Sequence, residues 1–420
     1  MPMKISDVVI IGAGAAGLMA AGCAAADGAT VMLLEKMPQP GKKLAISGKG
    51  RGNLTNTAAI AEFIGHFGKN GDFLRQAFAR FFRDELLVIL AEEGVATVTE
   101  RGGRIFAASG RAEDVAVVLR LRATRLGAQL VTNCRVQAIG HDGGMFTVTG
   151  DTGAILAKTV ILATGGASYP RTGSTGDGYR LAAAFGHSVI PPRPALVPLV
   201  TNPAPEQETI GLTLRNIGLK VTIQGKKAQE DFGELDFTAD GLSGPLILKW
   251  SGAIVDALAA GRAVHLTIDL KPALTDEQLA ERLRRDASSR GAEPLRSLLR
   301  GLMAKELLSS CLRDCELAAG KTVAKLSEGE WRRLHYWLKQ RPYTVTGHRP
   351  LAEALVTAGG VSLKEVNPYT MESRLVPGLY FAGEVLDLQA DTGGYNLQAA
   401  FSTGALAGKS AANAARANAG

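Results

Sequence analysis

The sequence has few of the residues that mark disulfide-rich or metal-binding proteins. It contains four cysteines and six histidines in 420 residues, and none of them stand at the spacing of a metal site. Cys311 and Cys315 lie one helical turn apart without a nearby histidine, which makes a weak metal site. Scattered cysteines are typical of reduced, buried thiols in a cytoplasmic protein. We therefore expect no metal and a cytoplasmic location.

Long apolar runs and sequence repeats are also absent. The most apolar stretch, 8–26, is interrupted by four glycines and is followed by polar residues, unlike a leader peptide. No other stretch is long enough to span a bilayer, and no period indicates a solenoid. With 46% apolar and 21% charged residues, the composition is typical of a soluble enzyme without membrane attachment. The length favours two or three domains.

Glycine, in contrast, is abundant, and its first cluster has the spacing of a dinucleotide-binding turn. The cluster follows a β-branched run at 7–11 and consists of Gly12, Ala13, Gly14, Ala15, Ala16 and Gly17. In this pattern Gly12 makes the turn, Gly14 lets the backbone approach a pyrophosphate, and Gly17 allows helix and strand to pack closely. The helix expected at 18–26 would direct its N-terminal N–H groups at the phosphates.

An acidic residue completes the fingerprint. The predicted second strand, 30–34, ends at Glu35, where an acid accepts hydrogen bonds from the hydroxyls of a ribose. We expect Lys36, the next residue, to contact the same ligand. Together these features predict dinucleotide binding.

Two further segments indicate FAD rather than NAD. A strand at 158–162 precedes Thr164, Gly165 and Gly166, and a strand at 378–382 precedes Gly383 and Glu384. Flavoproteins of the two-dinucleotide-binding type use such segments behind the adenine half and against the ribitol chain. Because the segments come from the middle and the end of the chain, we expect the FAD domain to be built from both ends. No second glycine fingerprint predicts a separate NAD domain.

With these segments, the sequence resembles the BaiN/RdsA-like family of FAD-dependent flavoproteins, formerly called NAD(FAD)-utilising dehydrogenases. The resemblance runs nearly end to end and rests on blocks that include GKKLAISGKGRGNLTN at 41–56, GGASYPRTGSTGDG at 165–178 and TGGYNLQ at 392–398. One departure is Gly52, where the family usually has cysteine. Any role of that thiol in the family does not extend to this chain.

The resemblance implies an α/β fold: a Rossmann-type FAD-binding domain with an inserted β-barrel-like domain and a small helical domain. The expected boundaries are 1–193 and 362–420 for the FAD-binding domain, 194–274 and 343–361 for the barrel, and 275–342 for the helical domain. Helical periodicity between 277 and 339, with Ser327 as an N-cap, agrees with this division.

The cofactor implied is FAD held without a covalent bond. The glycine-rich loop after the second strand is expected to lie over the pyrophosphate, with Arg51 neutralising phosphate charge. The helix that begins near Tyr395 is expected to point its N–H groups at the flavin N1–C2=O edge. The predicted contacts beyond the fingerprint are Lys43, Arg51, Asn53, Thr164, Gly165, Gly166, Gly383, Glu384 with Asp387 as second choice, Gly394, Tyr395, Asn396 and Leu397.

No motif identifies the group that moves a proton. Tyr395, Tyr169 and His348 are candidates by position alone, and no Ser/His/Asp constellation is apparent among the six histidines.

The positive charge is concentrated in one segment. Between residues 281 and 350 there are 15 Lys or Arg and 8 Asp or Glu, a difference of 15 − 8 = +7 that equals the net charge of the whole chain. Such a concentration favours an anionic partner. Trp331, His335, Tyr336 and Trp337 lie among basic residues there, an arrangement that either binds RNA phosphates and stacks bases or belongs to a core.

Several functions remain open. The resemblance favours a reductase that delivers flavin hydride to a carbonyl-conjugated C=C bond, and the basic segment favours a uridine of large-subunit ribosomal RNA over a steroid-like enone. An FAD oxidase of a small amine and a non-catalytic, flavin-containing RNA-binding or assembly factor are the alternatives. NAD(P)H is a candidate transient electron donor.

Overall fold

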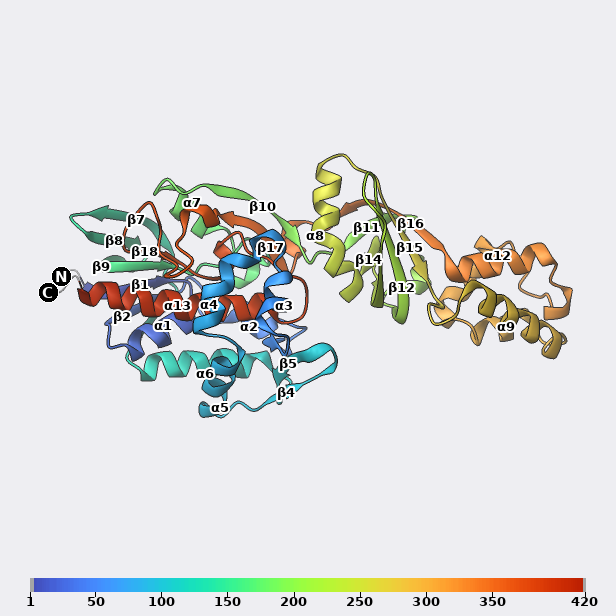
Figure 1. Ribbon diagram of the computed structural model, residues 1–420, viewed down its shortest axis with the longest axis horizontal. Helices are drawn as coiled ribbons and strands as arrows, with labels where there is room; N and C mark the ends of the chain where they lie inside the picture. Colours follow the sequence, from blue (N-terminus) through green and yellow to red (C-terminus); the bar gives the residue numbers. More distant parts are fainter. Residues whose placement is uncertain (1–3, 418–420) are drawn as a thin grey trace. The chain divides into compact units, whose positions relative to one another are not determined.

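The computed structural model describes residues 4–417, and the chain divides into two compact units. Unit 1 takes the chain up to Ala195 and again from Leu351 onward, whereas unit 2 takes Leu196–Pro350. The blue N-terminal and red C-terminal segments lie side by side in unit 1 (Figure 1). This confirms the predicted fold class, a Rossmann-type domain interrupted by a barrel and a helical insertion.

Unit 1 is built around a largely parallel sheet. Its strands, in spatial order, are β6 (Gln129–Val131), β2 (Val31–Leu34), β1 (Lys4–Ile11), β9 (Gly153–Leu162), β8 (Met145–Gly150) and β7 (Val136–Asp142). β18 (Leu379–Phe381) pairs in parallel with the end of β9. Val8, Val9 and Ile10 have no exposed surface, as expected for a strand covered on both faces. The sheet therefore joins β18, near the C-terminus, to strands of the N-terminal segment.

Two long helices from opposite ends of the chain pack against each other. α1 (Ala15–Ala26) follows β1, and α13 (Tyr395–Ala417) contains the last described residues. A Cβ on Gly404 would lie 2.3 Å from the Ala16 carbonyl oxygen, and one on Gly408 would lie 2.4 Å from that of Ala20. Both contacts are shorter than atoms tolerate, so glycine is required for the helices to approach this closely.

Shorter elements complete unit 1. The helices are α2 (Lys42–Ile46), α3 (Ile60–Gly65), α4 (Arg75–Arg80), α5 (Arg83–Glu92), α6 (Ala112–Arg125) and α7 (Asp177–Ala183). A small three-stranded sheet consists of β3 (Thr55–Asn56), β5 (Arg104–Ala107) and β4 (Thr97–Thr99). A separate two-stranded sheet pairs β10 (Val189–Ala195) with β17 (Val356–Val361).

The β10–β17 pair corrects one predicted boundary. We expected 343–361 to return to the barrel, but residues 351–361 belong to unit 1 because β17 pairs with β10. The helical segment also ends earlier than predicted, since β16 begins at Arg341. Proline-rich β10 gave no sign in the sequence that its partner lies more than 150 residues further on.

Unit 2 is a closed six-stranded barrel with a helical insertion. The strands, in order around the barrel, are β11 (Leu199–Asn202), β14 (Gly241–Ser243), β13 (Gln229–Phe237), β12 (Thr213–Ile223), β15 (Val264–Asp269) and β16 (Arg341–His348). The helices are α8 (Pro245–Ala259) and, between β15 and β16, α9 (Asp276–Ser289), α10 (Leu295–Arg300), α11 (Leu308–Asp314) and α12 (Glu328–Lys339). The barrel and the insertion share one apolar cluster.

Ser327 caps α12 as predicted: its side chain accepts from the Glu330 backbone N–H, and Glu330 accepts in return from the Ser327 N–H. None of the helices between residues 4 and 417 is both long and apolar enough to cross a membrane.

Candidate functional site

The turn between β1 and α1 leaves room for a ligand at one glycine only. A Cβ on Gly12 would lie 2.6 Å from the Ala163 carbonyl oxygen, and one on Gly17 would lie 1.8 Å from the Gly12 carbonyl oxygen. A Cβ on Gly14 would meet nothing within 4 Å. Gly12 and Gly17 are therefore fixed by packing, and Gly14 faces open space. No side chain caps α1 and no acid lies in its first turn, so its N–H groups suit an anion.

Glu35 stands at the end of β2 and holds the turn from the other side. Its Oε2 accepts from the Ala13 N–H at 2.8 Å, and its Oε1 accepts from the Met37 N–H at 2.8 Å. The residue is 9% exposed. A carboxylate has about four acceptor positions, so the two backbone contacts leave capacity for ribose hydroxyls.

An open cavity of about 410 Å³ lies next to Glu35, and its walls are Lys36, Met37, Arg135, Asp151, Thr175 and Asp177. Lys36 forms an ion pair with Asp177 at 2.8 Å, and Arg135 forms one with the same carboxylate at 3.0 Å. Burial by itself would raise the pKa of Asp177, but the hydrogen bonds from Lys36 and Arg135 outweigh burial and hold this pKa below its ordinary value. Lys36 is thus held by Asp177 at the edge of the cavity.

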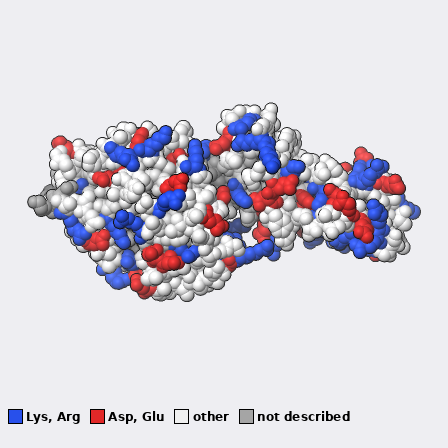
Figure 2. Space-filling model, viewed as in Figure 1, with Lys and Arg blue, Asp and Glu red and all other residues white. Residues whose placement is uncertain are grey.

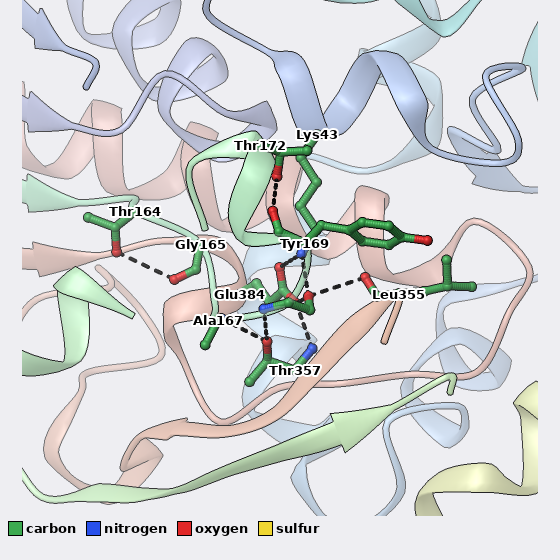
Figure 3. A network of polar contacts seen from close by, with 10 residues as sticks. Lys43, Thr164, Gly165, Ala167, Tyr169, Thr172, Leu355, Thr357 and Glu384 are labelled. Atoms are coloured by element: carbon green, nitrogen blue, oxygen red, sulfur yellow. Dashed lines mark hydrogen bonds and ion pairs between the residues drawn. The ribbon is translucent and has the colours of Figure 1, made fainter. Parts of the chain in front are cut away.

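A second cluster joins three distant segments at the carboxylate of Glu384 (Figure 3). The ammonium of Lys43 donates to Glu384 Oε2 and to Ser168 Oγ, both at 2.7 Å. The Thr357 N–H donates to Glu384 Oε1 at 2.7 Å, and Thr357 Oγ1 accepts from the N–H groups of Ala167 and Ser168. Both carboxylate oxygens therefore have protein partners, and a contact of Glu384 with the ribitol chain stays a prediction.

Gly166 is required for this cluster, because a Cβ there would lie 2.4 Å from Thr357 Oγ1. The predicted segments after β9 and β18 do meet here, because a Cβ on Gly165 would lie 3.2 Å from Ser174 Oγ and 4.0 Å from Glu384 Oε2. Asp387, the second choice for the ribitol contact, accepts instead from Asn70 Nδ2 through its backbone oxygen at 2.7 Å and its carboxylate at 3.1 Å.

The turn before α13 is pressed against β3. A Cβ on Gly394 would lie 2.4 Å from the Thr55 carbonyl oxygen, and Gly394 has a φ of +96°. Asn56 Nδ2 donates to the Gly393 carbonyl oxygen at 3.0 Å. Asn396 fixes the same loop, since its side-chain amide both accepts from and donates to the backbone of Ala390. The predicted glycine-rich loop and the predicted α13 turn are therefore neighbours.

Buried acceptors without a partner surround this junction. Asn53 Oδ1 and Thr55 Oγ1 come from the chain at and before β3, Gln398 Oε1 comes from α13, and Gln389 Oε1 comes from the loop before the Gly394 turn. None of these four atoms has a hydrogen-bond partner among the described residues. An unsatisfied buried polar atom costs about 1–3 kcal/mol, which a ligand with N–H and O–H groups would remove. A flavin ring and its ribitol chain carry such groups, so the residues present fit the cofactor.

Arg51 has partners within the protein, and Gly52 lies where a side chain would be crowded. The Arg51 guanidinium pairs with Glu100 and lies 4.6 Å from the centre of the Phe106 ring, and a contact of Arg51 with the pyrophosphate stays a prediction. Gly52 has a φ of +68°, and a Cβ there would lie 2.8 Å from that of Ala112. A cysteine at this position would therefore be strained by both the backbone conformation and the contact with α6.

The three proton-donor candidates lie in different surroundings. Tyr395 is buried between Phe63, in edge contact at 4.8 Å, and His66, stacked at 3.7 Å. Burial raises the pKa of Tyr395, and Glu62 and Asp391 raise it further. The Tyr169 hydroxyl points away from the Glu384 carboxylate in Figure 3.

His348 lies in unit 2, where its Nδ1 is 2.8 Å from the Arg349 carbonyl oxygen. No sequence pattern predicted a role for Thr357 or Ser168, or the pairing of His66 with Asp391 at 3.1 Å. Ser168 and Thr357 lie inside blocks of the family resemblance, at 165–178 and 357–361, and Asp391 borders the block at 392–398, but the resemblance gave none of them a role. In the described part of the chain no three or more His, Cys, Asp or Glu residues gather as a metal site.

Comparison with known proteins agrees with this geometry. The model of the HI0933-like protein Rossmann domain matches residues 6–410. The chain belongs to the HI0933-like family. The match confirms the resemblance found in the sequence, and the chain is an FAD-dependent oxidoreductase.

Curated relatives match over their whole length. A 3-dehydro-bile acid delta(4,6)-reductase of Clostridium scindens is 34% identical over 97% of this chain and 99% of its own. A ribosomal RNA dihydrouridine synthase of Haemophilus influenzae is 31% identical over 95% of this chain and 97% of its own. Among solved structures, the FrdA subunit of Escherichia coli quinol fumarate reductase has a TM-score of 0.52 at 18% identity, over 100% of this chain and 72% of its own. That likeness concerns the fold alone.

Proposed function

We propose that this enzyme reduces a C=C bond conjugated to a carbonyl group, and that its substrate is a uridine of large-subunit ribosomal RNA. The observation that carries the proposal is the agreement between two relatives that span at least 95% of this chain, one named as a bile acid delta(4,6)-reductase and one as a ribosomal RNA dihydrouridine synthase. Both names describe saturation of a C=C bond next to a conjugated carbonyl. Hydride attack at carbon requires such conjugation.

The residues of unit 1 support this chemistry by holding a flavin. Bound FAD supplies hydride from its reduced ring. The N-terminus of α1 beside Gly14 would hold the pyrophosphate, Glu35 the ribose, and the unpartnered acceptors of Asn53, Thr55 and Gln398 the flavin end. NAD(P)H would act as a transient donor, since the chain contains only one strand–glycine–helix fingerprint.

Surface charge supports an RNA substrate. The helical insertion carries Lys and Arg side chains interspersed with acids over α9 and α12 (Figure 2). Within its described residues, seven cations are exposed and form no ion pair: Arg284, Arg285, Arg296, Arg300, Lys305, Lys325 and Arg332. Exposed, unpaired cations are the groups that neutralise phosphates without reading sequence. An RNA substrate also implies a cytoplasmic enzyme.

The aromatic residues of the same segment support RNA stacking only in part. Trp337 is buried and donates to Asp314 at 3.0 Å, and Arg341 is buried 4.8 Å from the Trp337 ring centre. Lys339 pairs with Asp269 at 2.6 Å. These residues hold the insertion to the barrel, and only Tyr336 exposes a large aromatic surface, 56%.

Loss of the gene tests the proposal. We expect dihydrouridine to disappear from large-subunit ribosomal RNA in a deletion strain, measured by mass spectrometry of digested RNA. Plasmid-borne wild type should restore it, and the Gly14→Val variant should not. Unchanged dihydrouridine in the deletion strain would reject the RNA substrate.

A second candidate is reduction of a steroid-like enone, favoured by the higher identity of 34% to the bile acid reductase. It predicts that purified, reduced enzyme is reoxidised without oxygen by a 3-oxo-4,6-diene steroid and not by RNA. Reoxidation by oxygen alone would favour an amine oxidase instead.

A further inference from the structure

His66 and Asp391 form an acid–base pair beside the junction of β3 and α13. His66 follows α3, and its Nδ1 lies 3.1 Å from Asp391 Oδ2. An ionised carboxylate only accepts, so the Nδ1 position carries the proton in this contact. That leaves the second ring nitrogen, Nε2, with no hydrogen-bond partner among the described residues.

Tyr395 fixes the orientation of the imidazole. The two rings are stacked with centres 3.7 Å apart and planes inclined by 18°. Tyr395 is itself held by the edge of Phe63 and by Gly393, where a Cβ would lie 2.3 Å from the Tyr395 ring. A histidine that is held by a carboxylate at one nitrogen and by a ring on one face has a single direction for its other nitrogen.

The pair stands at the edge of the flavin site and remains open to solvent. Tyr395 directly follows the Gly394 turn that packs on Thr55, and the unpartnered acceptors Thr55 Oγ1 and Gln398 Oε1 lie on either side of it. The side chains of His66 and Asp391 are 26% and 34% exposed. The His66–Asp391 pair is therefore accessible from solvent. Glu62 and Asp391 are the charged groups close enough to Tyr395 to raise its pKa.

We propose that His66 is the general acid of the reduction, with Asp391 and Tyr395 as its positioning residues; this rests on the proposed C=C reduction. Hydride adds to the carbon β to the carbonyl, and the π electron pair moves to the α carbon as an enolate. The imidazolium Nε2–H of His66 then gives its proton to that carbon, and the neutral imidazole regains a proton from water. For uridine, hydride arrives at C6 and the proton at C5.

The first test compares two kinds of acceptor, unsaturated compounds and ferricyanide, in anaerobic stopped flow. Dithionite-reduced enzyme is mixed with protein-free large-subunit ribosomal RNA, with a 3-oxo-4,6-diene steroid, or with ferricyanide, which accepts electrons and needs no proton at carbon. We expect His66→Gln to slow reoxidation by the unsaturated compound about 100-fold, within the range for general acids, and to leave the ferricyanide rate unchanged. His141→Gln is the matched control, since His141 stacks on Phe146 at the far edge strand β7.

The second test needs no turnover. In protein labelled with ¹⁵N-histidine, the His66 signal should show the neutral ring with its proton on Nδ1 in the wild type. In Asp391→Asn it should show a mixture of the Nδ1–H and Nε2–H tautomers, because an amide does not require a donor as a carboxylate does. The flavin spectrum of Asp391→Asn should stay the same.

The outcomes separate the two proposals. A wild type that reacts with ferricyanide but with neither unsaturated compound overturns the proposed function, and the role of His66 with it. A wild type that reduces either compound while His66→Gln does so equally fast overturns the role of His66 alone. Equal slowing with ferricyanide, or an unchanged His66 tautomer in Asp391→Asn, also rejects it in favour of a structural contact.

Discussion

The cofactor site of unit 1 and the helical insertion of unit 2 differ in how many of their cations are paired. Around the cofactor site of unit 1, Lys43 pairs with Glu384 and Lys36 with Asp177. In the helical insertion of unit 2, seven exposed cations are unpaired. A paired cation fixes one geometry, which suits a single ligand of defined shape, whereas unpaired exposed cations suit a partner with many phosphates. Pairing of the cations therefore distinguishes these two regions, whereas net charge alone does not.

The largest effect is expected where unit 1 leaves space. Gly14→Val should abolish FAD binding, because its side chain would fill the space that the pyrophosphate needs. The apoprotein should remain folded, since a Cβ at Gly14 meets nothing within 4 Å. Flavin absorbance after gel filtration measures binding, and thermal unfolding of the apoprotein measures the fold.

Gly320→Val is the matched control for Gly14→Val, because Gly320 is also open within 4 Å and lies in unit 2. It should bind FAD like the wild type. Yellow Gly14→Val protein would contradict the placement of the cofactor at this turn.

A smaller effect, on stability, is expected at Gly52, where unit 1 is closely packed. Gly52→Cys should lower the free energy of unfolding by about 1–3 kcal/mol, the combined cost of a left-handed backbone and overpacking. The added Cβ would lie 2.8 Å from that of Ala112. The double variant Gly52→Cys/Ala112→Gly should therefore lose less free energy of unfolding than the two single variants lose together. Urea unfolding of the four proteins provides the cycle. Strict additivity would show that the Ala112 contact has no influence.

The smallest effect is expected on the surface of unit 2. Arg284→Ala/Arg285→Ala should reduce the salt slope of RNA binding by about 1.4, at about 0.7 per phosphate contact for single strands. Arg290→Ala/Arg313→Ala removes the same charge, but Arg290 pairs with Glu293 and Arg313 with Asp314, so its slope should change less. Filter binding at several salt concentrations gives both values. Equal slopes for the two variants would show that pairing does not select the RNA contacts.

Much of unit 1 could be predicted because its signals are local. The turn at Gly12, the acid at Glu35 and the glycines after β9 lie in short segments whose spacing reflects one structural requirement each. The barrel and the helical insertion were implied by the resemblance, and the Ser327 cap by its own sequence.

Contacts between distant segments could not be predicted. Lys43 meets Glu384 across 341 residues and His66 meets Asp391 across 325, and no local pattern links them. Arg341, one of the 15 cations counted between residues 281 and 350, is buried beside Trp337, because tertiary packing decides which side of a short strand faces the barrel. The end of the barrel was misplaced for the same reason, since β17 pairs with β10.

Single turnover without oxygen tests the central claim most directly. One equivalent of reduced enzyme is mixed with protein-free large-subunit ribosomal RNA, and flavin absorbance and dihydrouridine are measured in the same sample. The account predicts that the flavin is reoxidised and that one dihydrouridine forms for each flavin. Flavin that stays reduced until oxygen enters, with uridine unchanged, would contradict it.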